Sequence, residues 1–114
     1  MSNTPSKADV LQGTLDLMVL KTLESLGPQH GYAIAARLEQ VSGGALQLNM
    51  GTLYPALMRL EQRGLLRGKW GTTDTNRKAR YYALTAAGRR QLAREKAAWD
   101  QMAGIIHSLL EDKA

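Results

Sequence analysis

Apolar residues recur at helical spacing in four segments of the 114-residue chain. Residues 9–26 carry apolar side chains on two sides, which predicts a helix buried on both sides. Residues 30–41 form a second periodic segment that ends at a Ser-Gly-Gly sequence. Residues 49–66 place leucines at spacings of four and three, and residues 86–110 repeat large apolar residues every seven positions. The pattern therefore predicts four helices.

Between the third and fourth helices the pattern changes to short runs typical of strands. Residues 66–70 and 79–84 are β-prone, and the polar, turn-forming residues 71–78 separate them. This arrangement predicts a β-hairpin with a polar tip. Residues 45–48 also alternate, which predicts either a small strand or an extended link. The predicted fold class is mainly α with a small β-hairpin.

The third segment has the features of one short helix. Asn49 can cap its first turn, and Gly64 ends it. Three leucines share its buried face: Leu53, Leu57 and Leu60. Pro55 interrupts the pattern, because proline lacks a backbone donor and clashes with the preceding turn. We expect the first turn to be loose, kinked or continued from a different start, and a kink would aim it toward a ligand.

Charge is concentrated in the second half of the chain. Residues 59–96 contain eleven Arg or Lys and three acidic residues, a net charge of +8, whereas the remainder has a net charge of −3. A positive region beside a mildly acidic remainder favours a surface that binds a polyanion. A generic basic surface is the simpler alternative, and charge alone does not separate DNA from RNA or anionic lipid.

Several classes of protein lack support in the sequence. There is no cysteine, which excludes disulfides and thiolate sites, and the two histidines, His30 and His107, have no metal-binding spacing. No nucleophile elbow or phosphate loop is present, so we predict no catalytic residue, metal or cofactor. Residues 1–9 are polar and the longest aliphatic run is Leu17–Leu20, so we expect a cytoplasmic protein without a membrane partner.

The order of elements (helix, helix, short strand, helix, hairpin) predicts a winged helix-turn-helix followed by a long C-terminal helix. We expect a flexible arm at 1–8, a DNA-binding domain at 9–84 and a dimerisation helix at 85–114. The third helix would present its first residues to the major groove, and the hairpin would contact phosphates. The candidate DNA-binding residues are Tyr32, Asn49, Met50, Thr52, Tyr54, Arg59, Arg63, Lys69, Arg77, Lys78 and Arg80.

The last helix carries a heptad seam of about two and a half repeats. Because the first helix also has surplus apolar surface, we expect a homodimer, although a last helix that folds back on its own domain would fit the same pattern. The candidate dimerisation residues are Leu11, Leu15, Leu92, Trp99, Met102, Ile106 and Leu109. A two-fold dimer would match a palindromic double-stranded operator.

Five segments together resemble the PadR family of bacterial transcriptional regulators, in its short branch: LQGTLDLMVLKTL, HGYAIAARLEQ, GTLYPALMRLEQRGLL, KWG and RYYALTAAGRRQL. The resemblance covers about residues 10–110. It implies a winged helix-turn-helix with one C-terminal dimerisation helix, and repression of a neighbouring operon. The family's recognition helix maps to 49–63 and its wing to 70–81. Lys78-Ala79-Arg80 stands where many members have a more continuous basic run.

Trp99 matches, by position, a tryptophan at which some short members stack flat aromatic ligands. The resemblance thus makes Trp99 a candidate contact for a small aromatic effector, and a plain heptad core residue is the alternative. The predicted function is a dimeric, sequence-specific repressor released by a small ligand or signal. The alternatives are an RNA-binding or a protein-interaction winged-helix module without ligand control.

Overall fold

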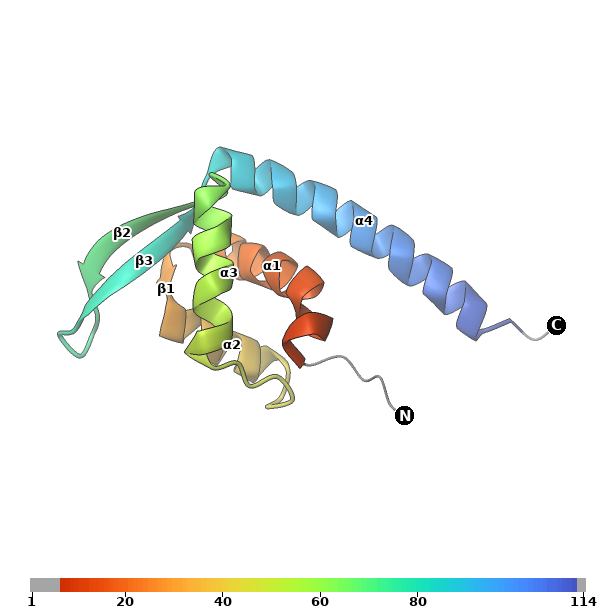
Figure 1. Ribbon diagram of the computed structural model, residues 1–114, viewed down its shortest axis with the longest axis horizontal. Coiled ribbons are helices and arrows are strands. Elements are labelled where there is room, and N and C mark those ends of the chain that lie inside the picture. Colours follow the sequence, from red (N-terminus) through yellow and green to blue (C-terminus); the bar gives the residue numbers. More distant parts are fainter. Residues whose placement is uncertain (1–6, 113–114) are drawn as a thin grey trace.

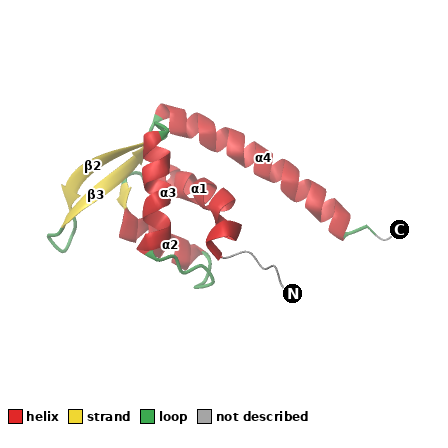
Figure 2. Ribbon diagram, in the orientation of Figure 1, coloured by secondary structure: helices red, strands yellow, loops and turns green. Residues whose placement is uncertain are grey.

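The computed structural model describes the backbone of residues 7–112 and the side chains of residues 14–112. The elements follow in the order α1 (Lys7–Leu26), β1 (Gln29–His30), α2 (Gly31–Val41), α3 (Met50–Gln62), β2 (Leu66–Thr72), β3 (Lys78–Leu84) and α4 (Ala86–Leu110). The hairpin and α4 extend from opposite sides of the three packed helices α1–α3 (Figures 1 and 2), so the molecule measures 59 × 33 × 24 Å.

The N-terminal region differs from its prediction in one respect. Helix α1 begins at Lys7, two residues before the expected start at Asp9. Residues 1–6 of the expected arm lie outside the described residues, as does the side chain of Leu11.

One apolar core joins α1, α2, α3 and the hairpin. The predicted inner face of α3 is confirmed, since Leu53, Leu57 and Leu60 are completely buried. Burying each leucine contributes on the order of 2 kcal/mol relative to exposure, so this face fixes α3 to the domain. The other core residues are Leu15, Val19, Leu20, Leu23, Ile34, Leu38, Ala56, Leu65, Leu66, Tyr82 and Leu92.

The sheet has three antiparallel strands in the order β1-β3-β2. Strands β2 and β3 form the predicted hairpin, with Lys69 opposite Tyr81 and Trp70 opposite Arg80. The short extra strand lies before α2, where Gln29 pairs with Tyr82, and residues 45–48 form a link without a strand. Of the two alternatives predicted for residues 45–48, the extended link is therefore confirmed. The third strand lies elsewhere, because it forms by pairing with β3.

Each of three helices begins at a side-chain cap. Asn49 Oδ1 accepts a hydrogen bond from Thr52 N at 2.9 Å, as predicted for α3. Thr85 stands directly before the predicted helix 86–110, where a threonine is a typical cap, and its Oγ1 accepts from Gly88 N at 3.0 Å, which confirms that cap. His30 Nδ1 accepts from Ala33 N at 3.3 Å and caps α2. Free N–H groups at helix starts need such partners, so these residues define where the helices begin.

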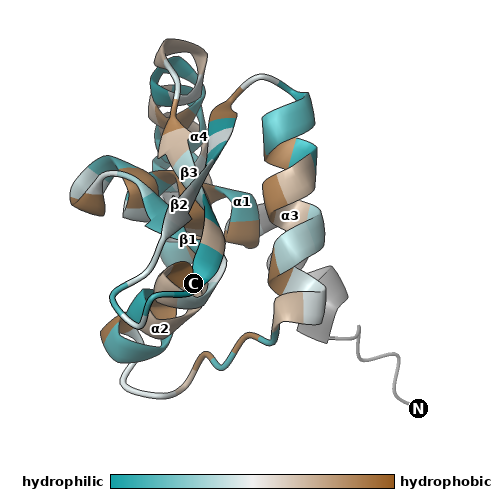
Figure 3. Cartoon of the chain, turned by 90° about the vertical axis from the view of Figure 1, so that its left-hand side faces the viewer, coloured by the Kyte–Doolittle hydropathy of each residue, from teal (hydrophilic) through white to brown (hydrophobic). Residues whose placement is uncertain are grey.

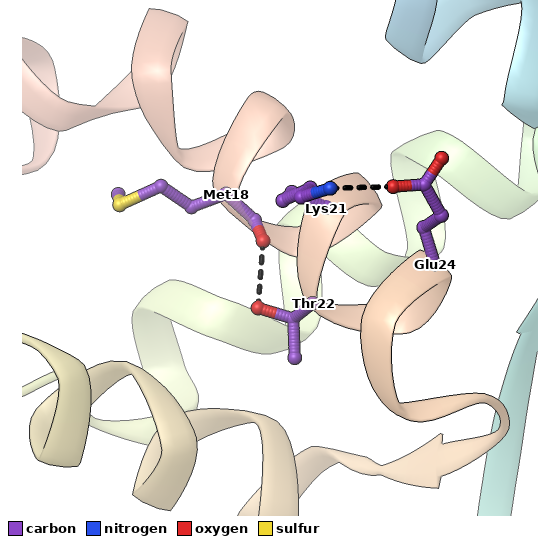
Figure 4. Close-up of polar contacts among 4 residues, drawn as sticks. All are labelled: Met18, Lys21, Thr22 and Glu24. Carbon is purple, nitrogen blue, oxygen red and sulfur yellow. Dashed lines mark hydrogen bonds and ion pairs between the residues drawn. The ribbon is translucent and has the colours of Figure 1, made fainter.

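Helix α1 satisfies its one buried polar side chain internally. Among the described residues only Thr22 is polar and buried, and its hydroxyl donates to the Met18 carbonyl at 2.8 Å (Figure 4). Lys21 pairs with Glu24 at 2.7 Å on the solvent side of the helix, and this hydrogen bond lowers the pKa of Glu24 (Figure 4). Within the described part of the chain, no helix combines the length and the apolar character needed to cross a bilayer.

Three apolar positions are placed differently from their predictions. Leu15 and Leu92 are 3% and 5% exposed within a single chain, where they belong to the core. They are therefore not part of a surface for a partner, because their own domain already covers them. The apolar period of residues 30–41 also predicts that Val41 faces inward, but its side chain is exposed at the end of α2. Periodicity marks an apolar face, but it does not say what covers that face.

Candidate nucleic-acid interface

The first two turns of α3 present an outward face with little charge. Tyr54 is 41% exposed, Thr52 and Met50 are half-buried, and Asn49 is exposed. Because the side-chain oxygen Oδ1 of Asn49 accepts the capping hydrogen bond, the side-chain NH₂ group is the part left to donate to a ligand. These residues offer hydroxyl and amide groups at a helix N-terminus, where free N–H groups and the helix dipole also favour anions.

Pro55 does not loosen the first turn as expected. Leu53 N and Thr52 N both donate to the Asn49 carbonyl at 3.1 Å, and α3 is continuous from Met50 to Gln62. The missing N–H of Pro55 leaves the Gly51 carbonyl without its usual helical donor. Gly51 and Pro55 are both exposed, so solvent can reach that carbonyl. The helix tolerates the proline because the Gly51 carbonyl lies on its solvent-exposed face.

A groove of about 830 Å³ separates the starts of α2 and α3 from the hairpin. Tyr32, which is 68% exposed and thus not a core tyrosine, lines the groove together with Tyr54. Trp70, Arg77 and Lys78 line the opposite wall. Viewed from the hairpin side, α3 stands beside the two strands (Figure 3). The groove thus brings together five of the predicted residues: Tyr32, Tyr54, Arg77, Lys78 and Arg80. The other predicted residues do not line it: Asn49, Met50, Thr52, Arg59, Arg63 and Lys69.

Strand alternation divides the basic residues of the hairpin between two faces. Trp70, Lys78 and Arg80 share the face that turns toward α3, where Tyr82 is buried. Lys69 lies opposite Tyr81 on the other face and does not line the groove. Because neighbouring residues of a strand face opposite sides, only one of Tyr81 and Tyr82 can lie in the core, and Tyr82 is that residue. Burial raises the pKa of the Tyr82 phenol.

The arginines of α3 differ in their partners. Arg59 donates to Asp16 of α1 at 2.7 Å, and both side chains are partly buried. Arg63 is exposed, and no carboxylate of the described residues lies within ion-pair distance of it. Arg59 is therefore a link between α1 and α3, whereas Arg63 remains available to an anion.

The cations of the hairpin also differ. Arg80 donates to Glu61 of α3 at 2.5 Å, and this hydrogen bond raises the pKa of Arg80. Lys78 lies 5.3 Å from the centre of the Trp70 ring, a cation–π arrangement on an exposed indole. Arg77 is exposed near the tip, and within the described residues it forms no ion pair. Arg77 and Lys78 are thus the cations of the groove that remain accessible.

Sequence reasoning missed three residues of this region. Trp70 is exposed in the groove beside Lys78, although only its place in the wing was noted. His30 caps α2 and meets Tyr81 edge-on at 5.3 Å between ring centres. Glu61 joins α3 to the hairpin. The pairing of the two predicted strands could have pointed to Trp70, because it places Arg80 directly opposite and Lys78 two residues further along the same face. The partners of His30 and Glu61 depend on tertiary packing.

The outer part of α4 carries the largest row of exposed apolar residues. Four of the predicted dimerisation residues are about half exposed or more: Trp99, Met102, Ile106 and Leu109. Ile105 and Leu110 extend the same region. Beside it, a shallow cleft of about 290 Å³ between α1 and α4 is lined by Thr14, Asp16, Leu17, Glu95, Ala98, Trp99 and Met102. Surface of this kind in a small protein commonly marks an interaction site.

The helices, the sheet and the groove define a winged helix-turn-helix regulator of transcription, a class that binds DNA. A family model described as "Transcriptional regulator PadR-like family" matches residues 19–94 of the chain. The chain belongs to this PadR-like family.

Similar proteins agree with that assignment. A PadR family transcriptional regulator from Eggerthella lenta is 31% identical, with 92% of this chain and 88% of that chain covered and a TM-score of 0.78. A transcriptional regulator from Clostridium thermocellum has a TM-score of 0.81 at 25% identity, covering 90% and 99%. An uncharacterised 37.1 kDa protein in transposon Tn4556 of Streptomyces fradiae is 41% identical over 88 residues. The match covers 76% of this chain but only 24% of that protein's length.

Proposed function

We propose that the chain is a dimeric, sequence-specific repressor that binds a palindromic operator in double-stranded DNA, in the cytoplasm. The observation that supports this most is the groove, in which Tyr54 of α3 and the accessible hairpin cations Arg77 and Lys78 line one space. An α-helix fits the major groove, where Thr, Tyr and Asn can meet base edges. The hairpin tip then lies over the flanking phosphates.

Nine of the eleven predicted residues contact DNA in this proposal. Thr52 and Tyr54 meet base edges, and Met50 and the Asn49 amide flank them. Tyr32 donates to a phosphate near the start of α2. The accessible cations neutralise phosphates: Arg63, Arg77 and Lys78. Lys69 lies on the face of the hairpin that turns away from the groove, so it reaches only DNA that passes over that face. Arg59 and Arg80 are engaged within the protein.

The exposed apolar row on α4 supports the dimer. A helix of 25 residues is about 38 Å long, and most of α4 beyond Leu92 is exposed in the single chain. We propose that Trp99, Met102, Ile106 and Leu109 pack against a second copy. Two copies related by a two-fold axis would place two α3 helices at two operator half-sites.

Release from DNA by a small ligand is the finer part of the proposal. Trp99 is 50% exposed beside the α1–α4 cleft, and an indole can stack on a flat aromatic molecule. A small aromatic effector bound there would touch both the domain and the dimerisation helix. It could thereby alter the spacing of the two α3 helices.

Footprinting on the DNA upstream of the chain's own gene tests the proposal. We expect two protected half-sites with centres about 10 bp apart, or a multiple of that spacing. Candidate aromatic ligands should weaken the protection if the effector role is right, and Trp99→Ala should abolish their effect. Uniform protection at all positions would contradict sequence-specific repression, whatever the ligands do.

A further inference from the structure

Glu61 contacts two different strands of the hairpin from its position on α3. Its Oε2 accepts from Arg80 Nη2 of β3 at 2.5 Å and from the Gly68 backbone N–H of β2 at 3.2 Å. Strand β2 is an edge strand, whose outward N–H groups otherwise lack a partner. One carboxylate thus satisfies an edge donor and pairs with a cation.

The space for Arg80 depends on the absence of a side chain at Gly68. A Cβ atom at Gly68 would lie 2.4 Å from Arg80 Nε, so the guanidinium of Arg80 occupies the place that a side chain would fill. The Arg80 guanidinium also lies 5.9 Å from the ring centre of Trp70 and 6.0 Å from that of Tyr82. Glu61, Gly68 and the two aromatic rings therefore define one position for the guanidinium.

We propose that Glu61 is a positioning residue for DNA recognition, which acts through Arg80 and the edge of β2. The contacts hold the hairpin at one fixed placement relative to α3, so that base edges and flanking phosphates are met together. They also withhold Arg80 from phosphate, which reduces affinity for DNA of any sequence. This second effect is the same for every sequence, so it is by fixing the placement of the hairpin that Glu61 raises the preference for the operator. This inference rests on the proposed function.

Three variants separate positioning from phosphate binding: Glu61→Ala, Arg80→Gln and, as a matched control, Arg77→Gln. Each is titrated against the footprinted operator and a random duplex of the same length at several salt concentrations. The salt slope is the change in the logarithm of the binding constant with the logarithm of the salt concentration, and the operator preference is the ratio of operator affinity to random-duplex affinity. Arg77→Gln should flatten the salt slope by about 0.9 on both duplexes and keep the operator preference.

Arg80→Gln should leave the salt slope unchanged and lower the operator preference roughly tenfold, about the cost of one mismatched base pair. Glu61→Ala should lower the preference similarly. The salt slope of Glu61→Ala should steepen by up to about 0.9, because Arg80, once released from Glu61, can reach a phosphate. The inference is overturned if Arg80→Gln behaves like Arg77→Gln, or if Glu61→Ala keeps the wild-type preference.

Amide hydrogen exchange on the DNA-free protein provides a readout that needs no operator. The Gly68 amide should exchange several-fold faster in Glu61→Ala than in the wild type or Arg77→Gln, since its acceptor is removed. Equal exchange in all three proteins would contradict the positioning role. A wild type without operator preference would instead refute the proposed function, and the Gly68 exchange and the slopes on random duplex would still decide the role of Arg80.

Discussion

Individual side chains in this protein are used in ways that residue type alone does not determine. His30, Asn49 and Thr85 each accept a backbone N–H at a helix start, yet only the last two were predicted as caps. An imidazole can serve because its Nδ1 carries a lone pair when the ring is neutral. The sequence shows which polar residue precedes a helix. Whether its side chain accepts an N–H group of the first turn depends on the local geometry.

The cap at His30 should contribute measurable stability. We expect His30→Ala to lower the free energy of unfolding by about 1 kcal/mol, because Ala33 N loses its acceptor. His30→Asn removes the same ring but supplies a cap oxygen, and should recover most of that loss in urea denaturation. If the two variants are equally destabilised, the edge-on contact with Tyr81, not the cap, is what matters.

The two arginines of α3 give a second test at the residue scale. Arg59 is paired with Asp16, whereas Arg63 has no ion pair among the described residues. We expect Arg63→Gln to flatten the salt dependence of binding to random duplex by about 0.9, and Arg59→Gln to leave the slope unchanged. A flattened slope for Arg59→Gln would mean that DNA displaces Asp16 as its partner.

At the scale of elements, the helices and the hairpin could be predicted from hydrophobic spacing and turn residues. Helix α4 begins and ends where the pattern places it, and α3 is capped at Asn49. The short strand β1 could not be predicted, because two residues carry no periodicity and become a strand only by pairing with β3. The partners of Arg59 and Arg80 were missed for the same reason. They lie 43 and 19 residues away in the chain.

The start of α4 is packed tightly against the turn after α3. A Cβ at Gly88 would lie 2.2 Å from the Leu65 carbonyl oxygen, whereas one at Gly104 would meet nothing within 4 Å. We expect Gly88→Ala to reduce the free energy of unfolding by about 1–3 kcal/mol, since backbone must move. Gly104→Ala, on the same helix, should increase it by about 0.5–1 kcal/mol. Chemical denaturation measures both, and a harmless Gly88→Ala would contradict the close packing.

At the scale of the whole molecule, the exposed row on α4 is the feature that a single chain leaves unexplained. From Trp99 onward the predicted heptad seam is exposed, but the seam also included Leu92, which the domain itself buries. A seven-residue repeat continues through both regions because the same helix face serves first the core and then the exposed surface.

Breaking that row should separate the proposed dimer. We expect Ile106→Glu to sediment as a monomer, because it places a charge in an apolar contact. Gln101→Glu adds the same charge to an exposed position of the same helix, and should remain a dimer. An Ile106→Glu protein that sediments with the wild type would place the dimer contact elsewhere.

The central claim is that the start of α3 reads the sequence of an operator. Its most direct test is the affinity of wild type and Tyr54→Ala for the footprinted operator and for a random duplex, at one salt concentration. Loss of one base contact corresponds to about 1–3 kcal/mol, so operator affinity should fall by roughly tenfold or more while random-duplex affinity stays nearly constant. An equal loss on both duplexes would show that Tyr54 does not read bases, and would contradict the account.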